Sequence, residues 1–396
     1  MPLAASEKVG RCELLPLLGM LHRAGLQVLI LSIVSVLAPS CAQKPAVWRD
    51  PSSHKVQFVT VDENVKLEVL DWGGLGRPIV LLSGLGNTAH VFDDFASRLT
   101  TDYHVYGITR RGYGASSAPA SGYSADRLAD DVIAVLDALK INRPVLVGHS
   151  IAGDEMSSVG TRHPERVAGL VYLDAGYSNS FYDRSLGNVN IDSRELQEKL
   201  EQMRAASTPQ EHRKLVEELV EQDLPGMEAE LRELLKFLQA EPAHPVSPPT
   251  PSADDLASFP AYQAFTKRVQ GVAYPEAELR QMNESRPDGG VGKHQDKSSI
   301  RSAIEAGEQR YTEIRAPVLA FFANPRDRAP YAYNTPAERA DFEALQAASI
   351  EAQVKAFERG VPSARVVRVA NANHYVFLSN EADVLREMRA FLAGLQ

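Results

Sequence analysis

Short apolar segments alternate with amphipathic stretches along most of the chain. The segments PIVLL, HVYGI, PVLVG and VAGLVYLD end near residues 82, 108, 148 and 174. Apolar runs of this length are typical of strands that are buried on both faces of a sheet. Between the second and third of them, residues 124–139 start with a capping serine and repeat apolar residues at Leu128, Val132, Val135 and Leu139, which predicts a helix. Strands joined through helices in this order predict a doubly wound, mostly parallel sheet.

The two ends of this sheet have their own patterns. VQFVTV and VKLEVLDW flank the turn-forming residues 62–64, so they are expected to form an antiparallel hairpin. The strand pattern returns at PVLAFFA (317–323), continues through a long helix at about 337–357, and ends with ARVVRVA (364–370) and a helix from about residue 381. The prediction is an α/β fold with an eight-stranded, mostly parallel sheet.

Residues 177–310 interrupt this alternation. They contain no convincing strand and hold charged amphipathic stretches such as SRELQEKLEQM and MEAELRELLKFLQ, separated by the proline-rich segment EPAHPVSPPTPS. We therefore predict a core formed by residues 43–176 and 311–396, with a helical insertion at 177–310 after the sixth strand.

The first 42 residues have the pattern of a leader. His22 and Arg23 precede an apolar run from residue 24 to 38, and small residues follow at Ser40 and Ala42. This is typical of a cleaved secretory signal, and the run is shorter than the about 20 residues of a membrane span. We expect translation to start at Met20 and the protein to be exported to the periplasm or secreted, with no stable membrane span after cleavage. The alternatives are an uncleaved membrane anchor and lipidation of Cys41.

Composition narrows the classes of function. The chain of 396 residues is 44% hydrophobic, which allows a large core, and its net charge of −9 does not favour nucleic-acid binding. It contains only two cysteines, no zinc-like Cys/His spacing and no phosphate-binding loop. Nothing in the sequence indicates an oligomeric state.

The strongest chemical signal is GHSIAG at residues 148–153, between a predicted strand and a predicted helix. A serine on such a tight turn has its hydroxyl exposed at the edge of the sheet, and its small neighbours avoid collisions. Ser150 is therefore the predicted nucleophile. The backbone amide of Ile151, at the start of the helix, is expected to face a developing oxyanion.

A serine nucleophile needs a base. His374 follows the last predicted strand, in the polar loop of ANANHYVFLS, where it can reach the same sheet edge. His149 belongs to the turn itself, and His163 follows the next helix, where a surface role is expected. His374 is the predicted base.

These segments resemble the α/β-hydrolase superfamily, and within it the capped serine hydrolases that include esterases, carbon–carbon bond hydrolases and proline iminopeptidase-like enzymes. The resemblance covers about residues 56–176 and 311–394, through GHSIAG, SGLGNTAHVFDDFA, RRGYGASS and ANHYVFLS. The chain departs from the family at Ser83, where histidine is usual, and at Thr109, where aspartate is common. The resemblance implies that the amide of Leu85 is the second oxyanion donor and that the insertion is a cap over the serine.

Two carboxylates at strand ends compete for the role of triad acid. The usual family position is the loop after the seventh strand, which contains Asp327 in ANPRDR. Asp174, after VYL, is the position in some lipase-like relatives, and it is also explained by a carboxylate that accepts backbone amides in a turn. We predict Asp327.

The resemblance implies attack on an acyl carbon without a metal or organic cofactor, because relatives that open epoxides or remove halogens use aspartate in place of Ser150. The expected function is hydrolysis of an ester or related acyl bond of a small molecule through an acyl-enzyme on Ser150. Two alternatives remain, an iminopeptidase-like amide hydrolase with an acidic cap pocket, and a non-catalytic ligand-binding protein on the same fold.

Overall fold

The computed structural model describes residues 48–240, 249–327 and 335–395. The predicted leader, residues 1–42, lies outside these ranges, so its cleavage stays a prediction. Within the described part of the chain, no helix is both long enough and apolar enough to cross a membrane.

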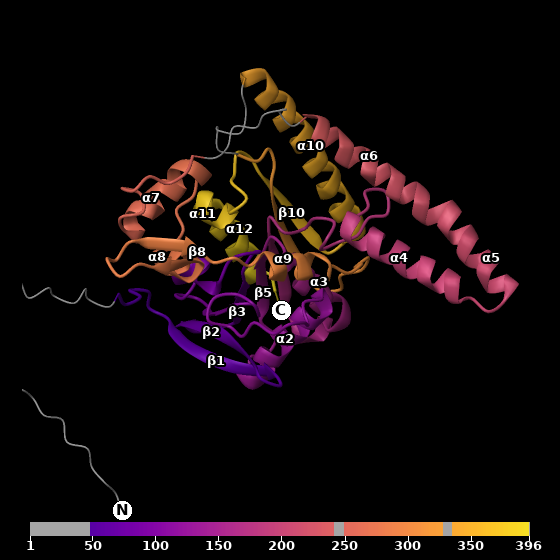
Figure 1. The fold of residues 1–396 in the computed structure, drawn as a ribbon. Helices are drawn as coiled ribbons and strands as arrows, with labels where there is room; N and C mark the ends of the chain where they lie inside the picture. Colours follow the sequence, from indigo (N-terminus) through magenta and orange to yellow (C-terminus); the bar gives the residue numbers. More distant parts are fainter. Residues whose placement is uncertain (1–47, 241–248, 328–334, 396) are drawn as a thin grey trace, which may run out of the picture. The chain divides into compact units, whose positions relative to one another are not determined.

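An eight-stranded sheet forms the centre of the fold (Figure 1). Its strands are β1 (Lys55–Asp62), β2 (Val65–Gly73), β3 (Pro78–Leu82), β4 (His104–Ile108), β5 (Val145–His149), β6 (Gly169–Leu173), β9 (Val318–Ala323) and β10 (Ala364–Val369). Their order across the sheet is β1-β2-β4-β3-β5-β6-β9-β10. β1 and β2 form the predicted antiparallel hairpin, β2 also pairs antiparallel with β4, and every other pairing is parallel. The predicted fold class is confirmed.

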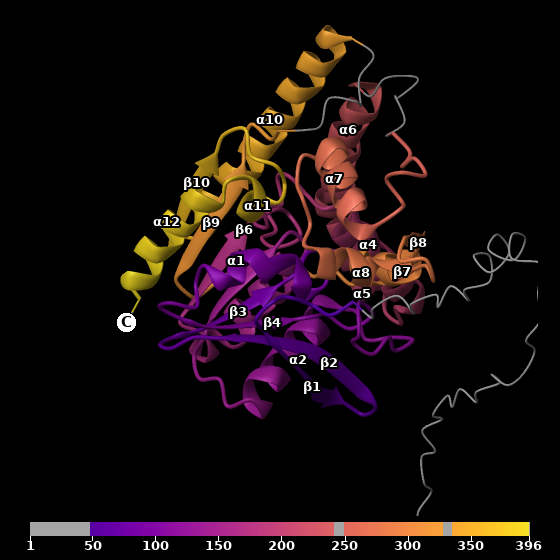
Figure 2. The same cartoon turned by 90° about the vertical axis from the view of Figure 1, so that its left-hand side faces the viewer.

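Helices cover both faces of this sheet (Figure 2). The flanking helical elements are η1 (Ala89–Phe92), α1 (Asp93–Ser97), α2 (Ala125–Ala138), α3 (Ala152–Arg162), η2 (Pro164–Arg166), α10 (Pro336–Gly360), α11 (Val376–Ser379) and α12 (Glu381–Ala393). One buried apolar cluster joins the sheet to η1, α1 and α12, and a second joins it to α2, α3 and α10. Two such layers explain why the central strands are apolar on both faces.

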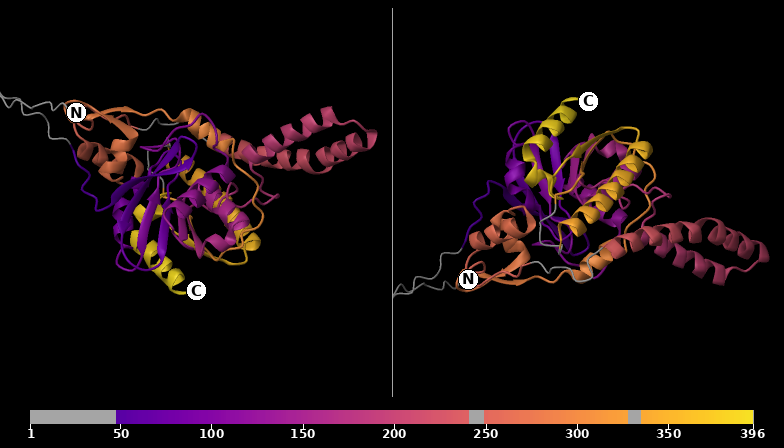
Figure 3. Two further views of the ribbon diagram at one scale, coloured as in Figure 1. Left: turned by 90° about the horizontal axis from the view of Figure 1, so that it is seen from below. Right: turned by 90° about the horizontal axis from the view of Figure 1, so that it is seen from above.

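The chain between β6 and β9 contains the predicted helices. They are α4 (Val189–Ala205), α5 (Pro209–Glu218), the π-helical segment η3 (Leu219–Asp223), α6 (Leu224–Ala240), α7 (Phe259–Gln270), α8 (Glu276–Met282) and α9 (Ser298–Glu305). Figure 3 shows α4 running beside α5 and α6, and these helices are in contact. We call the segment from residue 177 to 310 the insertion.

One prediction for the insertion is wrong, because it contains a small second sheet. β7 (Asn283–Ser285) pairs antiparallel with β8 (Val291–His294). The two strands have the sequences NES and VGKH, which are too short and too polar to show the apolar alternation by which a strand is recognised.

Glu278 on α8 joins the insertion to the loop after β3. Its side chain is fully buried, and it accepts hydrogen bonds from Asn87 Nδ2 at 2.9 Å, from the Thr88 amide at 3.1 Å and from the Thr88 hydroxyl. Burial raises the pKa of Glu278 to about 7, although the hydrogen bonds from Thr88 and Asn87 lower it. The folded chain therefore keeps a proton on this carboxyl at pH values where the unfolded chain has released it.

This shift predicts a pH dependence of stability. Between about pH 4.5 and 7 the folded state binds more protons at Glu278 than the unfolded state, so the free energy of unfolding should fall as pH rises, by up to about 1.4 kcal/mol per pH unit. Glu278→Gln keeps a neutral side chain of the same shape and should remove this contribution to the slope. Denaturant unfolding at pH 5, 6 and 7 measures it, with Glu276→Gln on the same helix as the control. A slope that is unchanged in Glu278→Gln would contradict the assignment.

Candidate active site

Ser150 occupies the predicted strand-to-helix turn. It lies between β5 and α3 with a backbone φ of 56°, a left-handed conformation that is rare for residues other than glycine. The small neighbours are required by space, as predicted. A Cβ at Gly148 would lie 2.7 Å from Met156 Cε, and a Cβ at Gly153 would lie 2.2 Å from the backbone oxygen of Ala175.

His374 connects this serine to a carboxylate. His374 Nε2 lies 2.9 Å from Ser150 Oγ, and His374 Nδ1 lies 2.6 Å from Asp174 Oδ2. When Nδ1 carries the ring proton and donates a hydrogen bond to Asp174, Nε2 is free to accept the proton of the serine hydroxyl. The chain thus holds a serine, a histidine and a carboxylate in hydrogen-bond contact, the arrangement in which a histidine can act as a base toward a serine.

The structure corrects the choice of acid from Asp327 to Asp174. Asp327 is exposed, and its backbone amide donates to the carbonyl of Ala372 at 2.8 Å. A parallel bridge between Arg326 and Ala372 fixes the chain after β9, and it is the side chain of Arg326 that points to the triad. Asp174 directly follows β6, with a left-handed backbone φ of 49° and a fully buried side chain.

The surroundings of Asp174 keep it ionised. Its Oδ1 accepts from the Ala323 amide at 2.9 Å and from the Tyr177 hydroxyl, and its Oδ2 accepts from Arg326 Nη2 at 2.6 Å. Burial raises the pKa of this carboxyl, but the charge of Arg326 and the hydrogen bonds of His374 and Tyr177 outweigh it and lower the pKa to about 2. A carboxylate with this pKa is charged across the whole neutral range, as the orienting group of a histidine base must be.

His149 contacts His374, an interaction that the sequence did not indicate. It is buried, and its Nε2 lies 3.1 Å from the backbone oxygen of His374, to which it donates. The two imidazole ring centroids are 4.6 Å apart. Burial lowers the pKa of His149 well below its usual value, and the nearby His374 lowers it further. A neutral His149 therefore holds the backbone of His374 in place without adding a charge beside it.

The serine opens into a cavity of about 370 Å³ between the core and the insertion. Leu85 and Ile151 both line it, and within the described residues neither of their backbone amides donates a hydrogen bond. Polar side chains of the insertion complete the wall, namely Asn179, Asn190, Arg301, Glu305 and Glu308. The two free amides next to Ser150 are where the sequence and the resemblance predict oxyanion donors.

A larger cavity of about 620 Å³ adjoins the first. The two share Leu85, Asn87, Arg301 and Tyr375, and the larger one continues between the loop after β3 and the elements α7, α8 and β8 of the insertion. Its wall includes the aromatic side chain of Tyr262 on α7, whereas Phe181, Tyr182 and Phe259 of the insertion are buried and line neither cavity.

The fold and the geometry around Ser150 are those of the α/β-hydrolase family. Residues 77–381, more than half of the chain, match the family model described as alpha/beta hydrolase fold, and the chain belongs to this family.

Curated relatives of the chain are hydrolases and haloperoxidases. It is 34% identical over 120 residues to a non-heme chloroperoxidase of Streptomyces lividans, a match that covers 30% of this chain and 44% of the relative. It is 28% identical over 101 residues to a 2-(acetamidomethylene)succinate hydrolase of Mesorhizobium japonicum, covering 26% of this chain and 36% of the relative. The matched part is thus less than half of each relative's length.

A solved structure of an E-2-(acetamidomethylene)succinate hydrolase is similar to the whole fold. It superposes with a TM-score of 0.52 over 86% of this chain and 100% of its own, at 16% identity. At this level of identity the likeness concerns the fold alone.

Proposed function

We propose that the protein is a serine hydrolase that cleaves an ester or related acyl bond of a small molecule. The observation that carries the proposal is the hydrogen-bonded series Ser150–His374–Asp174, with its serine facing a cavity. A buried, ionised aspartate, an imidazole and a serine in this order are the parts that nucleophilic acyl transfer needs.

The proposed reaction has two steps. Ser150 Oγ attacks the acyl carbon while its proton passes to His374 Nε2, which then delivers the proton to the leaving alcohol as the acyl–oxygen bond breaks. In the second step His374 takes a proton from a water molecule that attacks the acyl-enzyme, and it returns this proton to Ser150 Oγ. The amides of Ile151 and Leu85 are proposed to stabilise the oxyanion of each tetrahedral intermediate, which their free N–H groups at the cavity support.

We further propose that the insertion acts as a cap that selects the substrate. Its residues Asn179, Asn190, Arg301, Glu305 and Glu308 line the cavity into which the serine opens. Such a wall favours a small polar acyl compound over a long aliphatic one.

One observation favours the amide-hydrolase alternative. An enzyme that acts on the free amino end of an aminoacyl compound needs carboxylates near the serine, and Glu305 and Glu308 supply two. Both already have partners, because Asn188 Nδ2 donates to Glu308 at 2.8 Å and Arg301 lies 3.9 Å from Glu305. We therefore place ester hydrolysis first. A parallel screen of p-nitrophenyl esters and aminoacyl p-nitroanilides ranks the two by kcat/KM.

Labelling with a fluorophosphonate tests the proposal most directly. The purified protein is expected to take up one phosphonyl group per chain on Ser150, as seen by intact mass and peptide mapping, because only an activated serine reacts rapidly with this probe. Heat-denatured protein is the control, since it has the same serines without the triad geometry. A native protein that stays unlabelled and hydrolyses no ester or amide of the screen would support the non-catalytic alternative instead.

A further inference from the structure

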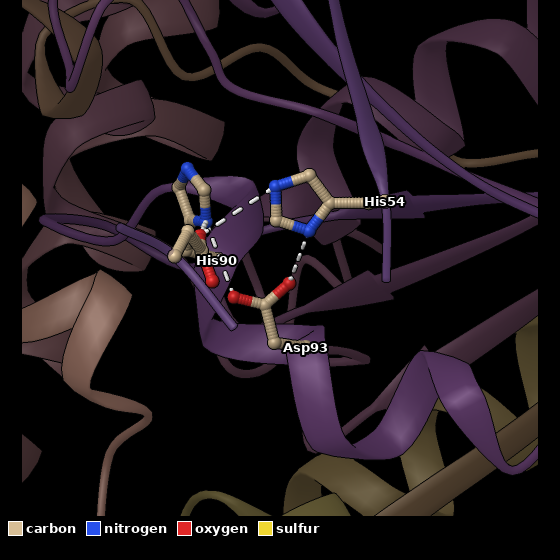
Figure 4. A group of neighbouring side chains, drawn as sticks. His54, His90 and Asp93 are labelled. Carbon is tan, nitrogen blue, oxygen red and sulfur yellow. Dashed lines mark hydrogen bonds and ion pairs between the residues drawn. The ribbon is translucent and has the colours of Figure 1, made fainter. Parts of the chain in front are cut away.

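A second cluster of ionisable side chains lies outside the active site, where the segment before β1 meets η1 and α1. It consists of Asp50, His54, His90 and Asp93. Figure 4 shows the imidazoles of His54 and His90 on either side of the Asp93 carboxylate, with one carboxylate oxygen directed toward each ring.

The distances in this cluster suit a single metal ion. One ligand atom from each of the four residues lies within 4.8 Å of the other three. His90 Nδ1 is 3.1 Å from Asp93 Oδ2 and 3.4 Å from Asp50 Oδ2, and His54 Nε2 is 3.6 Å from Asp50 Oδ2. Four ligands at about 2.0–2.1 Å from a tetrahedral ion are about 3.4 Å from one another, a value that these three separations approach.

The side chains of this cluster are buried and carry several carboxylates, which favours binding of a cation. The side chains of His54 and Asp93 are each 2% exposed and that of His90 is 5% exposed. A third carboxylate, buried Glu68, lies 3.8 Å from His90 Nε2. Within the described residues, no lysine or arginine forms an ion pair with Asp50, Glu68 or Asp93, whose ion-pair partners are the two imidazoles. Because such charge is costly to bury alone, it is offset either by a protonated imidazole or by a bound cation.

Neighbouring side chains already orient the cluster. Trp72 Nε1 donates to Asp93 Oδ1 at 3.1 Å, and the hydroxyl of Thr109 donates to Glu68 Oε2 at 2.8 Å. Outer hydrogen bonds of this kind fix the rotamers of ligands in metal sites and strengthen binding.

We propose that Asp50, His54, His90 and Asp93 bind one divalent transition-metal ion of the zinc class. Two imidazole nitrogens and two carboxylate oxygens are ligand types that zinc binds, and they lie close enough together for one ion to reach all four. Four protein ligands close the coordination sphere, so the ion would be structural. It would tie residues 50–54 to η1 and α1, which directly follow the loop that contains Leu85.

This site is not evident from the sequence, because its four ligands form two pairs that lie far apart in the chain. Asp50 and His54 are four residues apart, His90 and Asp93 are three apart, and no cysteine takes part. The negative charge of the buried carboxylates could also be offset by a protonated His90 that pairs with Asp93 and Glu68. The experiment must therefore distinguish a protonated imidazole from a bound metal ion.

Zinc binding to the purified full-length protein tests the proposal. After treatment with EDTA and dialysis against ZnSO₄, elemental analysis should find one zinc per chain, and zinc should raise Tm by about 5 °C over the EDTA-treated sample. His54→Gln should weaken zinc affinity at least tenfold and remove the rise in Tm. Asp50→Asn should do the same, and because Asp50 is partly exposed this variant serves if His54→Gln does not fold.

His104→Gln is the matched control. His104 Nε2 also pairs with an aspartate, Asp71 at 2.8 Å, but it lies outside the cluster, so zinc binding should be unchanged. Absence of stoichiometric zinc, or equal zinc binding by the wild type, His54→Gln and Asp50→Asn, would overturn the proposal in favour of the proton-filled cluster. A rise in Tm with Ca²⁺ or Mg²⁺ but not with Zn²⁺ would overturn the choice of metal.

Discussion

Ser150→Ala is expected to lower kcat for a small p-nitrophenyl ester by a factor on the order of 10⁶. In the proposed mechanism the hydroxyl bonds to the acyl carbon, so without it only direct attack by water remains, assisted by the proposed oxyanion donors, the amides of Ile151 and Leu85. Those amides should leave a residual rate above that in solution. Turnover by purified wild type and variant, followed by release of p-nitrophenol, measures the loss.

A second serine provides the control for this substitution. Ser157 lies on α3, and its hydroxyl is 3.0 Å from the Tyr172 hydroxyl, away from the cavity. Ser157→Ala should keep kcat within a few-fold of wild type and should lower Tm slightly, because one buried hydrogen bond is lost. If Ser150→Ala retained a tenth of wild-type turnover, the acyl-enzyme mechanism would have to be abandoned. The fold would still stand, because it does not depend on the reaction.

The sheet was predictable because its strands carry local signals. The central strands are short apolar runs buried on both faces, and the runs of β5 and β6 are fully buried along their length. Helices such as α2 show apolar residues at helical spacing and a serine cap at Ser124. The pair β7–β8 has no such signal, because its strands NES and VGKH are short and mostly polar.

The site was predictable only in part. Ser150 could be predicted because it lies in a turn between small residues, and His374 because it lies in a polar loop after the last strand. The acid has no comparable mark, because Asp174 and Asp327 both follow parallel strands whose ends meet at the same sheet edge. The left-handed backbone of Asp174 and the course of the chain at Arg326 decide between them, and both depend on tertiary contacts.

Asp174→Asn should lower kcat by a factor on the order of 10³–10⁴, the loss known for a triad whose acid is replaced by its amide. In the proposed mechanism the carboxylate accepts a hydrogen bond from His374 Nδ1 and stabilises the imidazolium that forms during the reaction. Asparagine supplies no negative charge, and its amide group can hold the wrong tautomer of His374. Asp327→Asn is the matched control, and because Asp327 is exposed it should keep kcat within about twofold of wild type.

Measuring the stability of Asp174→Asn shows whether a loss of turnover comes from the lost contact with His374 or from a destabilised fold. Its pKa in the folded protein is about 2, below the ordinary 3.8, so its ionised form stabilises the fold above about pH 4, and this contribution is lost as pH falls from about 4 to 2. Asp174→Asn should show less acid destabilisation in that window. It should also be less stable than wild type at pH 7, because Arg326 would lose the carboxylate 2.6 Å from its Nη2.

Turnover is therefore compared at a temperature where both aspartate variants are folded by circular dichroism. Under these conditions, a loss of 10³ or more in Asp327→Asn with near-normal turnover in Asp174→Asn would return the assignment to Asp327. It would mean that the loop after β9 rearranges when substrate binds.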